Sequence, residues 1–355
     1  MTKTETILSL RNISRTFGNK AAVKDVTLDI REGELFTIVG PSGSGKSTLI
    51  RMLAGLETPS AGDILLRGTR INDMPANRRP TCMVFQSLAL FNHMTVGENI
   101  EFALTVRGAD RKARRERARE LMALVRLPQE FYGKSVLRCS GGERQRVALA
   151  RALASDPDIL FFDEPLSAID YRLRKILEME MKDLNRETGK TFVYITHSLE
   201  EAMVMSDRIA VMRDGEIVQL GDPLSIYNAP STRFVAEFMG QVNLLPVAVD
   251  GNGNRVIEGI GAPVAQAFRA GPYSSIMLRP ERLRLLDKGR RADVEFDATC
   301  FNFYLLGSRT HVHLRRDERT FIVELSPDMA VPEPGAVVRV GFDWADAVSV
   351  QGEAP

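Results

Sequence analysis

Short apolar runs alternate with segments of helical periodicity along much of the chain. Glu34–Val39 (ELFTIV) is typical of a buried parallel strand, and Thr48–Ala54 (TLIRMLA) predicts a helix that ends at Gly55. Further along, the pattern predicts in order a helix at Gly142–Ala154, a strand at Ile159–Asp163, a helix at Arg172–Arg186, a strand at Phe192–Thr196 and a helix at Leu199–Met205. This alternation predicts a parallel sheet flanked by helices.

Two other regions depart from this alternation. The first part of the chain predicts strands at Ile7–Leu10, Val26–Ile30 and Ile64–Leu66, separated by turn-forming clusters. From Thr95 to about Leu127 the sequence is rich in Ala, Leu, Arg and Glu, which favours helix. We therefore expect a β-rich N-terminal region and a helical subdomain at about residues 90–155.

After about Gly240 the pattern changes to short alternating runs separated by Gly, Pro and Asp. Strands are predicted at Ser275–Leu286, Ala292–Cys300, Thr310–Leu314, Thr320–Leu325 and Val337–Phe342. Several such strands suggest a small barrel of the oligonucleotide- or oligosaccharide-binding (OB) type. The 355 residues also favour two domains, which we place at 1–239 and 240–355.

Composition excludes several classes of protein. The apolar fraction of 44% and the charged fraction of 26% are those of an ordinary globular chain. The net charge of +1 gives no general attraction to nucleic acid, and the basic run Arg111–Arg119 is interpreted as a solvated helix face. Cys82, Cys139 and Cys300 lack metal-ligand spacing, which favours a reducing compartment. Because no signal peptide or membrane span is recognised, a membrane role would require a partner.

The segment GPSGSGKST lies between the predicted strand at Glu34–Val39 and the helix that follows. It fits the phosphate-binding pattern in which glycines let the loop curl around a phosphate at a helix N-terminus. A lysine in this pattern supplies a cation, and the next hydroxyl ligates magnesium. We predict that the whole loop binds a nucleotide: Gly40, Pro41, Ser42, Gly43, Ser44, Gly45, Lys46, Ser47 and Thr48.

Polar side chains follow the predicted strands where ligands of open α/β folds bind. Asp163 and Glu164 end the strand ILFF, His197 follows FVYIT, and Gln86 follows MVF. The aspartate can hold the magnesium coordination shell, and the glutamate can polarise the water that attacks the γ-phosphate. A glutamine can accept from magnesium-bound water. Taken alone, a solvated acidic turn, a surface glutamine and a surface histidine are the alternative interpretations.

A second motif, CSGGERQR at Cys139–Arg146, stands ahead of the ILFFDEP segment. Together these residues resemble the ATP-binding cassette (ABC) ATPases, from about Leu8 to Met239. The resemblance implies an α/β P-loop NTPase cassette with a parallel or mixed sheet core, a helical subdomain and an antiparallel β subdomain, followed by the OB-like barrel. The matched positions are Phe17 for the adenine-stacking aromatic, Gly40–Thr48 for Walker A, Gln86 for the Q-loop, Cys139–Glu143 for the signature, Asp163 and Glu164 for Walker B and the catalytic glutamate, Ser167–Asp170 for the D-loop, and His197 for the switch histidine.

Three positions depart from the commonest family wording. Cys139 replaces a leucine, Glu143 replaces a glutamine, and Phe17 replaces a tyrosine. The residues whose hydroxyl and N–H groups would meet the γ-phosphate are intact, so we expect ATPase activity to survive. Phe17 keeps the stacking face without the hydroxyl.

The resemblance implies a head-to-tail homodimer that binds two ATP molecules, with Mg²⁺, at the shared interface. Glu164 would be the general base and His197, Lys46 and Gln86 would act with it. Ser47, Gln86 and Asp163 would hold the magnesium ion. The remaining nucleotide-binding residues that the resemblance implies are Phe17, Ser140, Gly141, Gly142, Glu143 and Asp170.

The C-terminal segment indicates the subclass. With EFMGQVNLL at Glu237–Leu245 and LRPERL at Leu278–Leu283, it resembles the C-terminal domain (TOBE, OB-like) of ATPases that power solute importers for polyamines, sugars or ferric iron. This implies a peripheral subunit on the cytoplasmic face of the cell membrane, with a separate permease and an extracytoplasmic solute-binding protein. The resemblance leans toward a polyamine-like solute, while sugars, iron and oxyanions stay open.

Gln86–Met94 (QSLALFNHM) follows the Q-loop and is apolar, so we expect it to form the groove that receives a permease helix, with ordinary subdomain packing as the alternative. The alternative function is a soluble ABC ATPase that acts on nucleic acid or the ribosome. The chain lacks the second cassette or long coiled coil of such proteins, and the C-terminal aromatics lack a basic stripe. We therefore expect no nucleic-acid partner. A small-ligand regulatory site in the barrel stays open.

Overall fold

The computed structural model describes residues 5–167, 169–268, 273–286 and 289–351. The chain divides into two compact units, 1–223 and 224–355. This division lies before the boundary expected at 239/240, which stays a prediction. It groups α8 (Arg233–Phe238) with the second unit. None of the described helices is long and apolar enough to cross a membrane.

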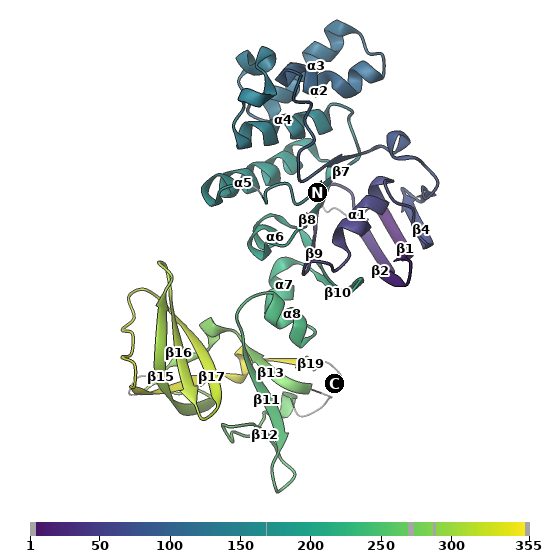
Figure 1. Cartoon of the computed structure of the whole chain (residues 1–355). Coiled ribbons are helices and arrows are strands. Elements are labelled where there is room, and N and C mark those ends of the chain that lie inside the picture. Colours follow the sequence, from purple (N-terminus) through teal and green to yellow (C-terminus); the bar gives the residue numbers. More distant parts are fainter. Residues whose placement is uncertain (1–4, 168, 269–272, 287–288, 352–355) are drawn as a thin grey trace. The chain divides into compact units, whose positions relative to one another are not determined.

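The first unit contains two sheets (Figure 1). An antiparallel sheet of order β2-β1-β4-β5 is built from β1 (Thr6–Phe17), β2 (Lys20–Arg31), β4 (Ala61–Leu66) and β5 (Thr69–Arg70). A mixed sheet of order β10-β9-β3-β8-β7-β6 is built from β3 (Leu35–Val39), β6 (Thr81–Val84), β7 (Ile159–Asp163), β8 (Thr191–Thr196), β9 (Arg208–Arg213) and β10 (Glu216–Gly221). Within it, β6, β7, β8, β3 and β9 are parallel and β10 is antiparallel.

The mixed sheet is buried on both faces, which explains its continuous apolar strands. In β7, Ile159 and Phe161 join the core shared with the antiparallel sheet and α1, whereas Leu160 and Phe162 join the core under the helices. The helices of this unit are α1 (Lys46–Ala54), α2 (Val96–Val106), α3 (Arg111–Leu124), α4 (Gly141–Leu153), α5 (Tyr171–Thr188) and α6 (Leu199–Met205). The predicted helical stretch from Thr95 to about Leu127 is therefore two helices, because Gly108 takes a positive φ of 74° between them.

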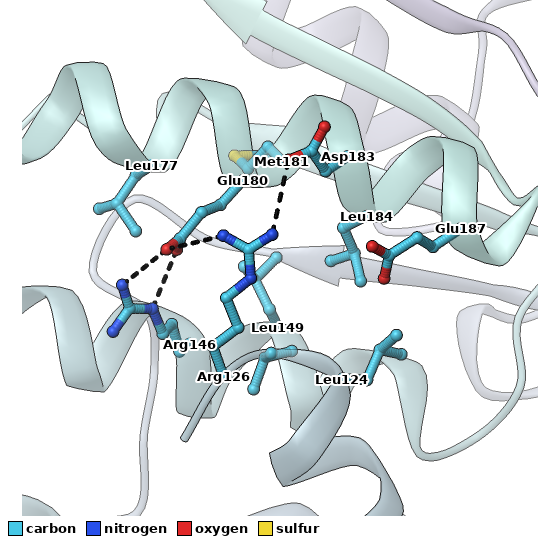
Figure 2. Close-up of a pocket in the computed structure, with 11 residues that line it drawn as sticks. Leu124, Arg126, Arg146, Leu149, Leu177, Glu180, Met181, Asp183, Leu184 and Glu187 are labelled. Atoms are coloured by element: carbon cyan, nitrogen blue, oxygen red, sulfur yellow. Dashed lines mark hydrogen bonds and ion pairs between the residues drawn. The ribbon is translucent and has the colours of Figure 1, made fainter. Parts of the chain in front are cut away.

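Ion pairs join α4, which begins within the CSGGERQR motif, to α5. Figure 2 shows Arg146 of α4 and Arg126, just beyond α3, facing Glu180 on α5 above an apolar pocket. Arg146 donates to both carboxylate oxygens of Glu180 at 3.0 and 2.9 Å, and Arg126 also reaches Asp183 at 3.5 Å. Because bidentate pairs fix orientation as well as distance, α4 is held at a defined position on α5.

The second unit is largely β (Figure 1). It contains α7 (Pro223–Asn228, with Pro223 just before the division) and α8 (Arg233–Phe238). Its first sheet has the order β12-β11-β13-β19, from β11 (Asn243–Val249), β12 (Arg255–Ile257), β13 (Tyr273–Leu278) and β19 (Val348–Gln351). Its second has the order β14-β18-β15-β16-β17, from β14 (Arg284–Leu285), β15 (Val294–Leu305), β16 (Thr310–Arg316), β17 (Arg319–Leu325) and β18 (Val337–Phe342).

The expected strand Ser275–Leu286 is two strands, because Pro280 starts a short 3₁₀ turn between β13 and β14. The two sheets are tied together by Asn243, whose side-chain amide bonds both backbone groups of Ile322 at 2.7 and 2.8 Å. The fold is thus an α/β cassette with an antiparallel β subdomain and a helical subdomain, followed by a small all-β domain, as the sequence predicts.

Candidate functional site

The loop Gly40–Thr48 connects β3 to α1 and needs glycine at two close backbone contacts. A Cβ on Gly40 would lie 2.1 Å from the Met212 carbonyl oxygen, and one on Gly45 would lie 2.2 Å from that of Ala22. Gly45 also has a φ of 101°, a region that side-chain-bearing residues rarely adopt. The loop is therefore held against β2 and β9 by contacts that no other residue permits, and it ends at the N-terminus of α1, where anions are favoured.

Lys46, the first residue of α1, is only 6% exposed. Its ammonium donates to the carbonyl oxygens of Gly40 and Pro41 at 2.8 and 3.0 Å, so it spans the mouth of the loop. Burial lowers the pKa of Lys46, and the nearby Glu164 and Asp163 carboxylates oppose that shift. The Ser44 hydroxyl is buried and has no hydrogen-bond partner among the described residues. A buried cation beside an unsatisfied hydroxyl suits a phosphate.

Hard oxygen donors meet beside this loop. The Ser47 hydroxyl donates to Asp163 Oδ1 at 3.3 Å, although the two residues lie far apart in the sequence. Burial raises the pKa of Asp163, because the carboxylate has lost part of its water, and a bound cation would oppose that shift. Since Mg²⁺ prefers oxygen ligands and usually keeps waters and substrate phosphates as further ligands, the pair fits that ion. No group of three or more His, Cys, Asp or Glu residues with metal-site geometry occurs in the described ranges.

Glu164 and His197 meet at the carboxyl edge of the mixed sheet. His197 Nδ1 lies 2.9 Å from Glu164 Oε2, and the histidine is exposed while the glutamate is mostly covered. Glu164 has a φ of 47°, and its N–H donates to the Ile195 carbonyl at 3.1 Å. A non-glycine residue in this region costs about 1–3 kcal/mol and is found where function requires the position. The pair places a carboxylate beside an imidazole ring at the sheet edge that also carries Asp163.

Gln86 is joined to the same edge by Ser167, which the sequence places at the start of the D-loop but to which it assigns no contact of its own. The Ser167 hydroxyl accepts from Gln86 Nε2 at 3.1 Å and donates to the Glu164 carbonyl at 2.9 Å. It therefore connects the Q-loop to the strained turn at Glu164. The available signal was the serine three positions after Glu164, which is typical of side-chain-to-backbone turns.

The signature residues form the first turn of α4. Ser140 caps the helix: its hydroxyl accepts from the Glu143 N–H at 3.3 Å, and the Glu143 carboxylate accepts from the Ser140 N–H at 2.9 Å. Lys134 donates to that carboxylate at 2.8 Å and lowers the pKa of Glu143. Cys139 is buried in the apolar cluster under the helices, where burial raises the pKa of its thiol. Cysteine thus takes the packing place of the usual leucine.

The predicted site residues do not all meet within one chain. In the described part of the molecule, no hydrogen bond or ion pair joins Ser140, Gly141, Gly142 or Glu143 to the phosphate loop. Asp170 caps α5 by accepting from the Leu173 N–H at 3.0 Å. Phe17 ends β1 and is 46% exposed, with the Arg15 guanidinium 4.6 Å from its ring centre. Ala168, inside the predicted D-loop, lies outside the described residues.

Comparison with known proteins agrees with this geometry. The ABC transporter family model matches residues 23–167, and the TOBE domain model matches residues 276–350. The "Spermidine/putrescine import ATP-binding protein PotA" of Mesorhizobium japonicum is 45% identical, with 96% of this chain and 93% of that protein covered. Its counterpart from Roseobacter denitrificans is 42% identical, with 96% of each covered.

Among solved structures, a dimeric ATP-binding cassette in a post-hydrolysis state, bound to ADP and Pi, is 34% identical with a TM-score of 0.54. The match covers 61% of this chain and 99% of that one. The full-length relatives, the phosphate loop and the cassette fold agree with one another. The chain therefore belongs to the ATP-binding subunits of ABC transporters with a TOBE domain, and it is an ATPase that binds ATP with Mg²⁺.

Proposed function

We propose that this chain powers the uptake of spermidine, putrescine or a similar polyamine by hydrolysing ATP. The observation that carries the proposal is the 45% identity over 96% of the chain to a protein named for spermidine/putrescine import. No residue of the chain has to touch the solute, so the solute is assigned by similarity of the whole motor. Sugars, ferric iron and oxyanions are the competing solutes.

In this proposal, Glu164 is the general base that takes a proton from the attacking water. The carboxylate is mostly buried and lies 2.9 Å from His197 Nδ1. The histidine can therefore orient the carboxylate and the γ-phosphate relative to each other. Lys46 and the loop N–H groups neutralise phosphate charge, and Phe17 stacks on the adenine. Ser47, Asp163 and Gln86 would hold Mg²⁺, which neutralises charge on the phosphate oxygens when bound.

The Glu164→Gln variant tests the general base. The amide preserves the size of the side chain but cannot accept a proton, so turnover should fall about 100-fold or more while ATP still binds. Size-exclusion chromatography with ATP should then show a trapped dimer. His197→Ala and Lys46→Ala should also nearly abolish turnover. Near-normal turnover of Glu164→Gln would assign the base elsewhere.

We further propose that two chains bind head to tail, so that Ser140, Gly141 and Gly142 of one chain reach the ATP held by the other. This proposal is supported by the dimeric relative and by the first turn of α4, which in the described residues makes no hydrogen bond or ion pair with the phosphate loop of its own chain. Glu143 and Asp170 would contribute mainly through the helix caps they form at this interface.

The dimer would dock on the cytoplasmic face of the cell membrane against a separate permease, with an extracytoplasmic protein that binds the solute. The surface proposed for the permease is Gln86–Met94. Leu88 and Leu90 pack partly against the core of the helical subdomain, while Ala89 and His93 are exposed. A charge at Leu90 would therefore damage the core in any event, and Ala89→Glu is the cleaner test. Unchanged permease-stimulated ATPase in Ala89→Glu would refute this surface.

Affinity purification of the tagged chain in mild detergent tests the importer against the alternative. Recovery of a permease that raises the ATPase rate supports import. Recovery of ribosomal or DNA-associated proteins, with an ATPase rate raised by nucleic acid, supports the soluble alternative. A thermal-shift screen of the co-purified binding protein against spermidine, putrescine, sugars and oxyanions then identifies the solute.

A further inference from the structure

The turn that follows Gln86 has an uncommon backbone. Leu88 and Ala89 adopt φ values of 60° and 46°, two successive left-handed residues of which neither is glycine. Such a pair is unfavourable unless other contacts hold it, because the Cβ of each residue crowds a backbone oxygen. The turn lies directly before Leu90 and Phe91, in the segment proposed above to meet the permease.

Arg151 holds this turn. Its two terminal nitrogens donate to the carbonyl oxygens of Ala89 and Leu88 at 2.6 and 2.7 Å, one to each. Its guanidinium carbon also lies 5.6 Å from the ring centre of Phe91, within the range of a cation–π contact. Burial lowers the pKa of Arg151, and in the described part of the chain this side chain forms no ion pair with a carboxylate. A half-buried cation therefore directs its planar fork at two backbone carbonyls.

A second side chain fixes the far end of the same segment. Asn99, fully buried in α2, accepts from the Phe91 N–H at 2.9 Å and donates to the Phe91 carbonyl at 3.1 Å. The Phe91 ring packs on Phe102 with 4.3 Å between ring centres. The segment between residues 88 and 91 is thus clamped from α4 on one side and from α2 on the other.

We call the hydrogen bonds of Arg151 and Asn99 to residues 88–91 the clamp, and the position of Arg151 on α4 relates this clamp to the nucleotide site. Ser140 caps the N-terminus of the helix and Arg151 lies in its last turn, so the two ends are about 17 Å apart at 1.5 Å per residue. One end faces the nucleotide of the partner in the proposed dimer, and the other end grips the proposed permease segment. Arg146 fixes the same helix on α5 through Glu180.

We infer that Arg151 is a positioning residue for transport coupling: it holds Leu88 and Ala89 in the left-handed turn that presents the following residues to the permease. The inference rests on the proposed permease contact of Gln86–Met94. Arg151 is not among the residues proposed to hold the nucleotide or the magnesium ion, so its loss should affect coupling more than the intrinsic ATPase rate.

Hydrogen exchange of the isolated chain tests the clamp without any permease. In Arg151→Met, the amides of Leu88, Phe91 and Met94, which are hydrogen-bonded within or next to the turn, should exchange about tenfold faster. Exchange in α1 should stay unchanged. Arg107→Met is the matched control, since Arg107 also donates to a backbone carbonyl in this subdomain, that of Ser155 at 3.2 Å, but does not touch residues 86–94. Unchanged exchange in Arg151→Met overturns the clamp, whether or not a permease is found.

The reconstituted complex tests coupling. Arg151→Met and Arg151→Lys should lower the stimulation of ATPase by the permease at least fivefold and leave the unstimulated rate within twofold, because neither side chain has the planar pair of terminal nitrogens that donates one bond to each carbonyl. Adding Ala89→Gly to Arg151→Met removes the backbone penalty at the exposed residue of the turn, leaves the Leu88 packing in place, and should restore part of the lost stimulation. A parallel fall of stimulated and unstimulated rates, or full stimulation in Arg151→Met, overturns the inference. If wild type is not stimulated by any permease, the proposed function fails and the coupling role of Arg151 is overturned with it, while the exchange result separately decides the clamp.

Discussion

A buried arginine fixes the end of the helix that carries the phosphate loop. Arg79 is 4% exposed and donates to the carbonyl oxygens of Met52 and Leu53 in the last turn of α1, and to those of Ile71 and Met74. The Met52 oxygen also accepts from the Gly55 N–H, and the Ile71 oxygen from the Met74 N–H, whereas among the described residues the Leu53 and Met74 oxygens accept from Arg79 alone. Arg79→Met should therefore leave two acceptors unpaired and lower the free energy of unfolding of the N-terminal unit by about 2–4 kcal/mol.

Denaturant unfolding followed by far-UV circular dichroism measures this loss. Arg78→Met is the control, because Arg78 is an exposed neighbour and its replacement should cost less than about 0.5 kcal/mol. Equal effects of the two substitutions would show that the carbonyls are satisfied without Arg79.

Tyr227, in the second unit, should lose its proton only at an unusually high pH. Burial, and then the Glu281 carboxylate, raise the pKa of Tyr227 to about 12 from 10.0. Because the folded-state pKa is raised, the stability that the neutral phenol contributes is fully present below about pH 10 and is lost as the pH rises through about 12. Burial also raises the pKa of Tyr132 and of Tyr194, so several tyrosines should ionise late. Alkaline titration by ultraviolet absorbance should therefore show a late tyrosinate rise that is smaller by one tyrosine in Tyr227→Phe. A variant with an unchanged titration above pH 10 would contradict this assignment.

At the scale of elements, two residues in the first turn of α4 should differ in their roles: Glu143 supports the helix cap, and Ser140 also contacts the nucleotide in the proposed dimer. Glu143 stands where the family has glutamine, and a glutamine at this position could keep the hydrogen bond to the Ser140 N–H. Glu143→Gln should lose only the partly exposed ion pair with Lys134, worth about 0.2–1 kcal/mol, and should keep the ATPase rate within about twofold. Ser140→Ala should lose the cap, about 1 kcal/mol, and nearly all turnover. Thermal unfolding and ATPase assays of both variants measure the difference. If Glu143→Gln lost as much turnover as Ser140→Ala, the carboxylate itself would act at the composite site.

Elements with one dominant local signal were predictable from the sequence. The strands β7 and β8 and the helix α6 lie within a residue of their predicted bounds, because a buried parallel sheet requires continuous apolar runs. The phosphate loop was predictable because close backbone contacts require glycine at fixed positions, which leaves a recognisable sequence pattern. The hydrogen bonds of Arg79 and Arg151 to backbone carbonyls were not predictable, because the acceptors belong to segments far away in the sequence. The break at Pro280 had a local signal, since proline cannot continue a strand ladder.

At the scale of the whole molecule, the residues proposed for the catalytic site fall into two groups within one chain. The phosphate loop, Asp163, Glu164 and His197 meet at one sheet edge, whereas Ser140 caps a helix of the other subdomain. If each ATP lies between two chains, a defect in one group can be complemented by a partner with a defect in the other group. A site contained in one chain could not be complemented in this way.

Differently tagged chains decide between these arrangements. In a Glu164→Gln background, Lys46→Ala and Ser140→Ala should each abolish ATP-induced dimerisation when alone. In a mixed dimer, Lys46 of one chain and Ser140 of the other complete one site and leave the second doubly defective. Pull-down through both tags should therefore recover mixed dimers that carry about one ATP, against about two for the Glu164→Gln parent. If mixing recovers no dimer, the head-to-tail arrangement is wrong. If either variant dimerises alone as well as the parent, the substituted residue does not contribute to the shared site.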